Sequence, residues 1–212
     1  MRLSFDVPYF HCPPDMKPYL QKVFDGEYEV PLIYAKEQPV VLDLGANCGA
    51  FAIWATHRWP GCKVHAFEPH PETFKYLEAN VRQYGNIYAH KYAVGEAGLR
   101  VLHNGPNNCG ESSLHLMQNM AYPTGQHVEV TDPLSMPRDA RILKMDIEGC
   151  EMEVLEPLIR DGRKFDAIML EYHNADLRRE VDALLSDYYL TNSLVTKHGL
   201  GVVCYMRKEL LA

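Results

Sequence analysis

The feature that most constrains the fold is a short apolar run that leads directly into a glycine turn and a helix. Residues 40–44 read Val-Val-Leu-Asp-Leu, and such a run is typical of a strand buried on both faces of a sheet. A helix is predicted at 50–58, where Pro60-Gly61 ends it, and a second strand at 63–68. This order predicts a β-α-β unit with two parallel strands.

The alternation of strands and helices continues along the chain. A helix is predicted to begin at Pro71 and to end with Gly85 as its C′ residue, and a third strand is predicted at 87–94. The later expected elements are an inserted strand at 99–102, a strand at 141–147, a helix at 151–160, a strand at 165–172, an amphipathic helix after Asp176, and a hairpin of strands at 190–196 and 202–207. Their order predicts a doubly wound α/β fold with a mostly parallel seven-stranded sheet and an antiparallel last strand.

Two segments fall outside this alternation. Prolines interrupt residues 1–38, so we expect a lead-in that packs on the core, with 39–212 as the domain proper and a single domain overall. The segment 104–126 is rich in Gly, Pro, Asn and Ser and is too long for a routine connection. We expect a functional loop near a binding site there.

Composition disfavours several classes of protein. Acidic residues outnumber basic ones by 28 to 21 and the net charge is -7, which argues against a nucleic-acid partner. No apolar stretch is long enough for a membrane span, and the N-terminus lacks the layout of a secretion signal, so we expect a cytoplasmic protein without a membrane partner. The 6 cysteines include no C-x-x-C pair. We expect reduced, mostly structural thiols without a zinc cluster or a disulfide framework.

The glycine turn at 43–49 indicates a ligand site. Gly45 lets the backbone turn sharply and approach a ligand, and Gly49 lets the following helix pack closely. The turn departs from the G-x-G-x-x-G of dinucleotide folds because Asn47 takes the middle position. Asp43, two positions before the first glycine, suits a ligand with an ammonium group, such as the methionyl part of S-adenosylmethionine.

A second acid extends this site. Glu68 closes the second strand about 20 residues beyond the glycines, where a carboxylate that accepts hydrogen bonds from ribose hydroxyls is expected. The loop around Ala93 and Val94, after the third strand, is expected to lie against adenine. The alternative is that Glu68 only caps the helix that follows Pro69.

Charged residues gather at two later strands. Lys144, Asp146 and Glu148 stand at alternate positions, so on a strand they would share one face, and buried charges there need partners or a purpose. His173 follows the next strand, and a histidine can take a proton from an alcohol near neutral pH. The alternatives are an ion pair of Lys144 that supports the fold, a helix-dipole role for Glu148 and a surface role for His173.

Three motifs in this order resemble those of the FkbM-type methyltransferases: 43–49 (Asp-Leu-Gly-Ala-Asn-Cys-Gly), 67–69 (Phe-Glu-Pro) and 144–149 (Lys-Met-Asp-Ile-Glu-Gly). The resemblance implies a class I, Rossmann-like methyltransferase fold, S-adenosylmethionine as methyl donor, and a hydroxyl group of a sugar, polyketide or related natural product as acceptor. It implies that the donor is held by Asp43, Gly45, Ala46, Asn47, Gly49 and Glu68. The expected donor site also includes Pro69, Ala93, Val94, Asp146 and, from a segment that resembles the family's serine-bearing loop, Ser112.

These inferences predict an O-methyltransferase that acts on a small hydroxylated molecule. Glu148 and His173 are the candidate bases, and Lys144 is expected to orient the acceptor or stabilise its developing oxyanion. Two other functions stay open: an NAD(P)-dependent oxidoreductase on a Rossmann-like fold, and a donor-binding module without activity. A methyltransferase of RNA is disfavoured by the acidic balance. A metal at Asp146 and Glu171 is not favoured, because an obvious third ligand is missing.

Overall fold

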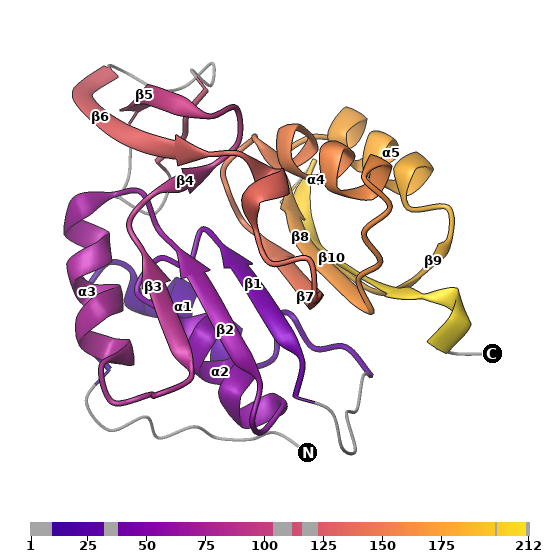
Figure 1. Cartoon of the computed structure of the whole chain (residues 1–212), viewed down its shortest axis with the longest axis horizontal. Helices are drawn as coiled ribbons and strands as arrows, with labels where there is room; N and C mark the ends of the chain where they lie inside the picture. Colours follow the sequence, from indigo (N-terminus) through magenta and orange to yellow (C-terminus); the bar gives the residue numbers. More distant parts are fainter. Residues whose placement is uncertain (1–9, 32–37, 104–111, 116–122, 198, 211–212) are drawn as a thin grey trace.

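The computed structural model describes residues 10–31, 38–103, 112–115, 123–197 and 199–210. Its centre is a seven-stranded sheet with the order β3-β2-β1-β7-β8-β10-β9 (Figure 1). The strands are β1 (Val40–Leu44), β2 (Lys63–Phe67), β3 (Ile87–His90), β7 (Ala140–Met145), β8 (Ala167–Tyr172), β9 (Tyr188–Lys197) and β10 (Leu200–Arg207). β10, the last strand in the chain, runs antiparallel to β8 and β9, whereas β1, β2, β3, β7 and β8 pair in parallel. The predicted sheet is confirmed.

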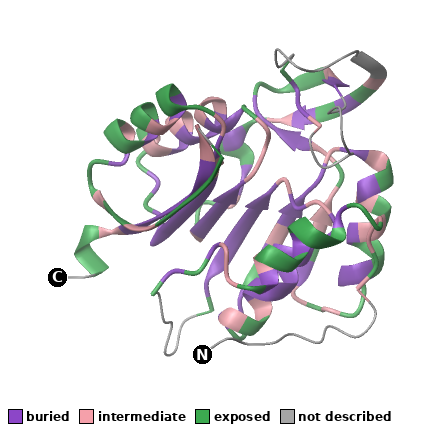
Figure 2. Cartoon of the chain, turned by 180° about the vertical axis from the view of Figure 1, so that it is seen from behind, coloured by how far each residue is buried: buried purple, intermediate pink, exposed green. Residues whose placement is uncertain are grey.

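Helices cover both faces of this sheet, as the doubly wound prediction requires. Three pack in one apolar cluster: α1 (Lys17–Phe24), α2 (Ala50–Arg58) and α3 (Pro71–Val81). Two pack in the cluster on the other face: α4 (Glu151–Arg160) and α5 (Ala175–Leu184). Two short 3-10 helices are η2 (Pro133–Ser135) and η3 (Lys208–Leu210). Figure 2 shows buried strands between helices whose outer surfaces are exposed, which is the burial that amphipathic helices on an apolar sheet produce.

A second, three-stranded sheet stands at one end of the large one (Figure 1). It has the order β4-β6-β5. Its strands are β4 (Ala93–Val94), β5 (Gly98–His103) and β6 (Pro123–Thr131). The prediction of one strand over 87–94 was wrong, because β3 pairs with β2 and β4 pairs with β6 in the other sheet. β6 was not predicted. It shortens the predicted loop at 104–126, of which 104–111 and 116–122 lie outside the described residues.

Other predicted boundaries also need correction. The helix that begins at Pro71 ends at Val81 and not at Gly85, because the Tyr84 N–H bonds to the Val81 carbonyl and closes a turn. The strand predicted at 141–147 ends at Met145. Asp146 and Glu148 therefore do not continue the strand face of Lys144.

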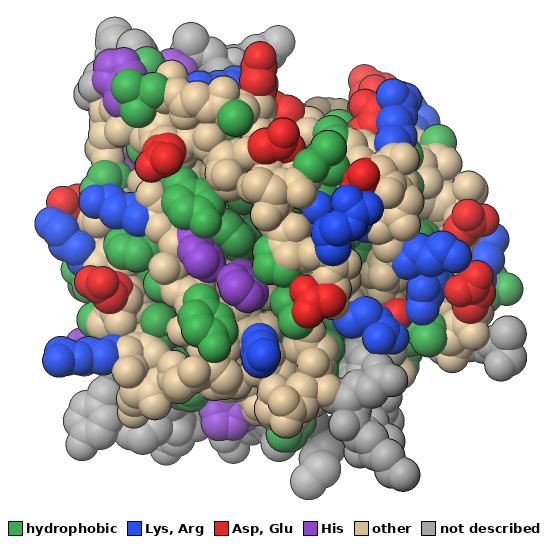
Figure 3. Space-filling model, viewed as in Figure 1, with side chains coloured by type: hydrophobic (Ala, Val, Ile, Leu, Met, Phe, Trp, Pro, Cys, Tyr) green, Lys and Arg blue, Asp and Glu red, His purple; other side chains and the backbone are tan. Residues whose placement is uncertain are grey.

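The surface and the cysteines add two observations. None of the described cysteines is in a disulfide, and they are Cys12, Cys48, Cys62, Cys150 and Cys204; Cys109 lies outside the described residues. Basic and acidic side chains are mixed on the face drawn in Figure 3. Within the described part of the chain, every helix is too short or too polar to cross a membrane.

Candidate active site

The glycine turn after β1 brings two strand tips into contact. Gly45 has φ +72°, and a Cβ there would lie 1.8 Å from the backbone oxygen of Asp146, just beyond β7. The N–H groups of Gly45 and Ala46 both bond to the Phe67 carbonyl at the end of β2. The turn therefore joins the tips of three neighbouring strands, which only a residue without a side chain permits at Gly45.

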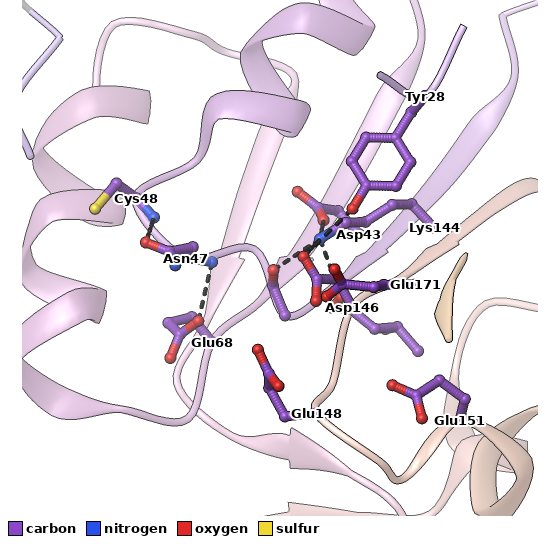
Figure 4. Close-up of polar contacts among 12 residues, drawn as sticks. Tyr28, Asp43, Asn47, Cys48, Glu68, Lys144, Asp146, Glu148, Glu151 and Glu171 are labelled. Carbon is purple, nitrogen blue, oxygen red and sulfur yellow. Dashed lines mark hydrogen bonds and ion pairs between the residues drawn. The ribbon is translucent and has the colours of Figure 1, made fainter. Parts of the chain in front are cut away.

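Glu68 is fixed beside this turn. Its Oε2 accepts a hydrogen bond from the Asn47 N–H at 2.9 Å (Figure 4), and its Oε1 accepts one from the His70 N–H at 2.8 Å. Burial raises the pKa of Glu68 to about 7, although both N–H groups lower it. Glu68 is thus an oriented carboxylate that changes charge near neutral pH.

A cleft opens over the turn and holds most of the predicted site residues. The empty space in it, its open mouth included, is about 620 Å³. The predicted residues in its wall are Gly45, Asn47, Glu68, Pro69, Ala93, Val94, Ser112, Asp146 and Glu148. The wall also contains residues that were not among the predicted site residues, although three of them lie within the motifs: Leu44, Phe67, Leu102, Leu114, Ile147 and Cys150.

Five predicted residues lie outside the cleft wall: Asp43, Ala46, Gly49, Lys144 and His173. Asp43 is fully buried, and its carboxylate faces Lys144 Nζ at 3.3 Å. Burial raises the pKa of Asp43, and the charge of Lys144 opposes this effect. Lys144 also donates to the Gly45 carbonyl at 2.8 Å. The contact between Asp43 and an ammonium group stays a prediction, and the structure adds a buried ion pair that supports the turn.

Asp146 is held from two sides. Lys144 Nζ lies 3.9 Å from Asp146 Oδ2, and Tyr28 Oη donates to the same oxygen at 3.3 Å (Figure 4). Tyr28 comes from the lead-in, is only 2% exposed, and lies with its ring 5.7 Å from Lys144 Nζ. Tyr28 was not predicted from the sequence, because no local pattern marks a tyrosine that reaches a residue more than one hundred positions away.

The tips of β7 and β8 bring Glu148 and His173 together. His173 Nε2 lies 3.0 Å from Glu148 Oε2 and 3.5 Å from Glu171 Oε2, while its Nδ1 lies 3.8 Å from Glu151 Oε1. Burial favours a lower pKa for His173, but the hydrogen bond and the charge of Glu148 outweigh it and raise this pKa to about 9. His173 therefore carries a positive charge at neutral pH.

Two serines beside the small sheet, Ser112 and Ser113, lie at the same end of the cleft. Ser112 is in the cleft wall, as predicted. Its neighbour Ser113 is buried and donates from Oγ to the Glu148 carbonyl at 2.5 Å. Glu148 has φ +56°, a strained conformation for a side-chain residue. The bond from Ser113 stabilises this turn.

The comparison with known families decides what kind of site this is. The profile described as "Methyltransferase FkbM domain" matches residues 43–190. The chain belongs to the FkbM methyltransferase family. This FkbM methyltransferase is 30% identical over 188 residues to the 31-O-demethyl-FK506 methyltransferase FkbM of Streptomyces tacrolimicus, with 72% of each chain covered. It is 26% identical over 164 residues to the hexuronic acid methyltransferase AglP of Haloferax volcanii, covering 76% of this chain and 66% of that protein.

Solved structures support the fold. The fibrillarin pre-rRNA processing protein of Methanococcus jannaschii matches with a TM-score of 0.53 at 11% identity, over 92% of this chain and 76% of that one. Aeropyrum pernix fibrillarin, in complex with S-adenosyl-L-methionine, matches with a TM-score of 0.51 at 12% identity, over 90% and 74%. The fold is that of the class I methyltransferases.

The methyl donor of this FkbM methyltransferase is S-adenosylmethionine. The cleft fits that molecule chemically. The backbone at Gly45 leaves a space that a Cβ would fill. The carboxylate of Glu68 is suited to accept hydrogen bonds from the two ribose hydroxyls of the donor. Small apolar side chains, Ala93 and Val94, line the same cleft and offer a surface for a flat ring.

Proposed function

We propose that this protein transfers the methyl group of S-adenosylmethionine to a hydroxyl oxygen of a small molecule. The observation that carries the proposal is the composition of the cleft, which has an oriented carboxylate, Glu68, in its wall and a second carboxylate, Glu148, in the same wall. The first suits the ribose of the donor, and the second suits an alcohol that must lose a proton.

The residues around the glycine turn are the proposed donor site. Glu68 would bind the ribose hydroxyls, Ala93 and Val94 would lie against adenine, and Asp146 would face the methionyl part. Lys144 and Tyr28 both contact Asp146, so we assign them the role of holding its carboxylate in place. Their effect on the reaction is one of positioning.

Glu148 is the proposed proton acceptor. S-adenosylmethionine supplies an electrophilic methyl carbon and a neutral leaving thioether. Glu148 lies in the cleft wall and His173 does not, so Glu148 is the better placed of the two to take the proton from the acceptor. His173, 3.0 Å from Glu148, would orient that carboxylate.

The acceptor is proposed to be a polyhydroxylated small molecule. The names of two relatives, a hexuronic acid methyltransferase and a 31-O-demethyl-FK506 methyltransferase, support sugars and polyketides as the first classes to test. The cleft wall has both apolar and polar side chains, because Leu102 and Leu114 are apolar whereas Ser112 is polar. The acidic composition of the chain, with its net charge of -7, favours these acceptors over a nucleic acid.

The experiment is a binding and turnover assay on the full chain. S-adenosylhomocysteine is expected to raise the melting temperature and NADH is not. Methyl transfer from labelled donor is then measured on hexuronic acids, neutral sugars and hydroxylated polyketides. Glu148→Gln should lower kcat by a factor on the order of 100 or more with donor binding retained, and Glu156→Gln, a partly exposed control on α4, should not. Donor binding without transfer to any hydroxyl acceptor would overturn the proposal.

A further inference from the structure

We propose that Glu148, Glu171 and His173 bind a divalent cation beside the donor cleft. From the sequence, a metal at Asp146 and Glu171 lacked an obvious third ligand. The structure brings a different set together, because the parallel pairing of β7 and β8 places the residues at their tips side by side, with Met145 opposite Leu170. One ligand atom from each of the three side chains lies within 4.8 Å of the other two.

The two distances from the imidazole nitrogen to the carboxylates match those of ligands around one ion. Divalent ions such as Zn²⁺ and Mg²⁺ bind nitrogen and oxygen at about 2.0–2.2 Å, so neighbouring ligand atoms are about 3.0 Å apart in an octahedral site and about 3.4 Å in a tetrahedral one. His173 Nε2 lies 3.0 Å from Glu148 Oε2 and 3.5 Å from Glu171 Oε2. An ion can therefore replace the proton shared by His173 and Glu148 without a rearrangement of the backbone.

The far side of the imidazole provides an independent observation. Glu151 is fully buried, and within the described part of the chain its Oε2 has no hydrogen-bond partner. Its Oε1 lies 3.8 Å from His173 Nδ1. A carboxylate behind a histidine is the arrangement that orients metal-binding imidazoles, since it fixes the ring and makes the other nitrogen a better ligand. Glu151 lies on this side of the ring, but at 3.8 Å it makes no hydrogen bond with His173 Nδ1, which has no hydrogen-bond partner among the described residues. His173 Nε2 faces the two ligand carboxylates, and with an ion at Nε2 the imidazole proton stays on Nδ1, on the side of Glu151.

Charge favours a cation in the same place. Asp146, Glu148, Glu151 and Glu171 bring four carboxylates to the tips of two strands (Figure 4). Among the described residues, the cations in contact with them are Lys144, at 3.9 Å from Asp146, and His173. Lys144 is also engaged by the buried Asp43 at 3.3 Å. Burial and the charge of Asp146 raise the pKa of Glu171 to about 10, so a divalent ion bound here would take the place of the Glu171 proton and offset the charge of the carboxylates around it.

The ligand set selects the kind of ion. One imidazole nitrogen and two carboxylate oxygens suit Mn²⁺ or Zn²⁺ better than Mg²⁺, which prefers oxygen ligands and retains its water. If the proposed function holds, the acceptor hydroxyl takes an open position on the ion, and its pKa falls. The oxygen–hydrogen bond then breaks with the proton passing to the free oxygen of Glu148 or to water, and the oxygen forms its new bond to the methyl carbon as the carbon–sulfur bond breaks.

The test is a titration of the chelator-treated full chain with Mn²⁺, followed by electron paramagnetic resonance of the free ion. One Mn²⁺ ion per chain is expected. Glu171→Gln should weaken the affinity at least tenfold, and Glu151→Gln about tenfold, as a lost supporting carboxylate does. Glu156→Gln should leave it unchanged. Thermal unfolding of each variant shows whether it is folded.

The outcomes separate this proposal from the proposed function. Absence of Mn²⁺ and Zn²⁺ binding by a chain that binds S-adenosylhomocysteine would overturn the cation site and leave methyl transfer standing. The same holds if Glu171→Gln and Glu151→Gln, both folded, bind Mn²⁺ as the parent chain does. Binding of one ion at these residues by a chain that methylates no hydroxyl acceptor would support the site and overturn the function.

Discussion

The contact between Gly45 and the tip of β7 gives a prediction that can be worked from the structure. A Cβ at Gly45 would lie 1.8 Å from the backbone oxygen of Asp146, and real Cβ atoms essentially never approach another atom within 3.0 Å. In Gly45→Ala the two strand tips must therefore separate by at least about 1.2 Å, because a backbone atom cannot rotate away as a side chain can. Gly162 provides the control, since its φ is +79° with nothing within 4 Å.

The expected magnitudes differ for these two glycines. Ala in a left-handed conformation costs about 1–2 kcal/mol, and this is the whole expected effect of Gly162→Ala. Gly45→Ala adds the strain of an overfilled contact, about 1–3 kcal/mol, and weakens the hydrogen bond from the Asp146 N–H to the Leu44 carbonyl, worth about 1 kcal/mol. The free energy of unfolding should fall by about 3–6 kcal/mol, a large part of the stability of an ordinary domain.

Urea unfolding measures the loss of stability, and calorimetry with S-adenosylhomocysteine measures donor affinity. Gly45→Ala should weaken the donor at least tenfold, which is about 1.4 kcal/mol, because Gly45 is in the cleft wall. Gly162→Ala should leave affinity unchanged. If Gly45→Ala loses no more stability and no more affinity than Gly162→Ala, the reasoning from close backbone approach is wrong.

Three other predictions follow from buried polar groups. The pKa of Glu68 is about 7, so the ionised carboxylate that accepts hydrogen bonds is the main form only above this pH. Donor affinity should therefore fall about tenfold for each pH unit below 7. Calorimetry measures this affinity, and Glu68→Gln should show no such dependence on pH. Tyr28→Phe removes the hydrogen bond to Asp146. The free energy of unfolding, measured with urea, should fall by about 1 kcal/mol, and KM for the donor should rise. An unchanged KM would refute the positioning role of Tyr28. Arg163→Met leaves three backbone carbonyls, now 2.7–3.1 Å from the guanidinium, without their hydrogen-bond donor. The free energy of unfolding should fall by about 3 kcal/mol, whereas the exposed control Arg138→Met should leave it unchanged.

The sequence alone determined the large sheet and predicted most of the residues that line the cleft. Each of these depends on information within a few neighbouring residues. A buried strand, a turn that needs glycine at Gly45, and an acid at the end of the next strand are all visible in short windows. The parallel order of the strands then follows from the β-α-β alternation, which is why Glu68 could be assigned to the cleft wall before the fold was known.

The tertiary structure decided the contacts between distant segments. Tyr28 reaches Asp146 from the lead-in, and Ser113 reaches Glu148 from a segment that bridges to His103 of β5. Neither contact leaves a periodic signal, because periodicity reports the face on which a residue lies and not its partner on another element. The convergence of Glu148, Glu171 and His173 depends in the same way on the register of β7 and β8. The register decides which side chains meet at the strand tips, and the order of residues in one segment does not contain this information.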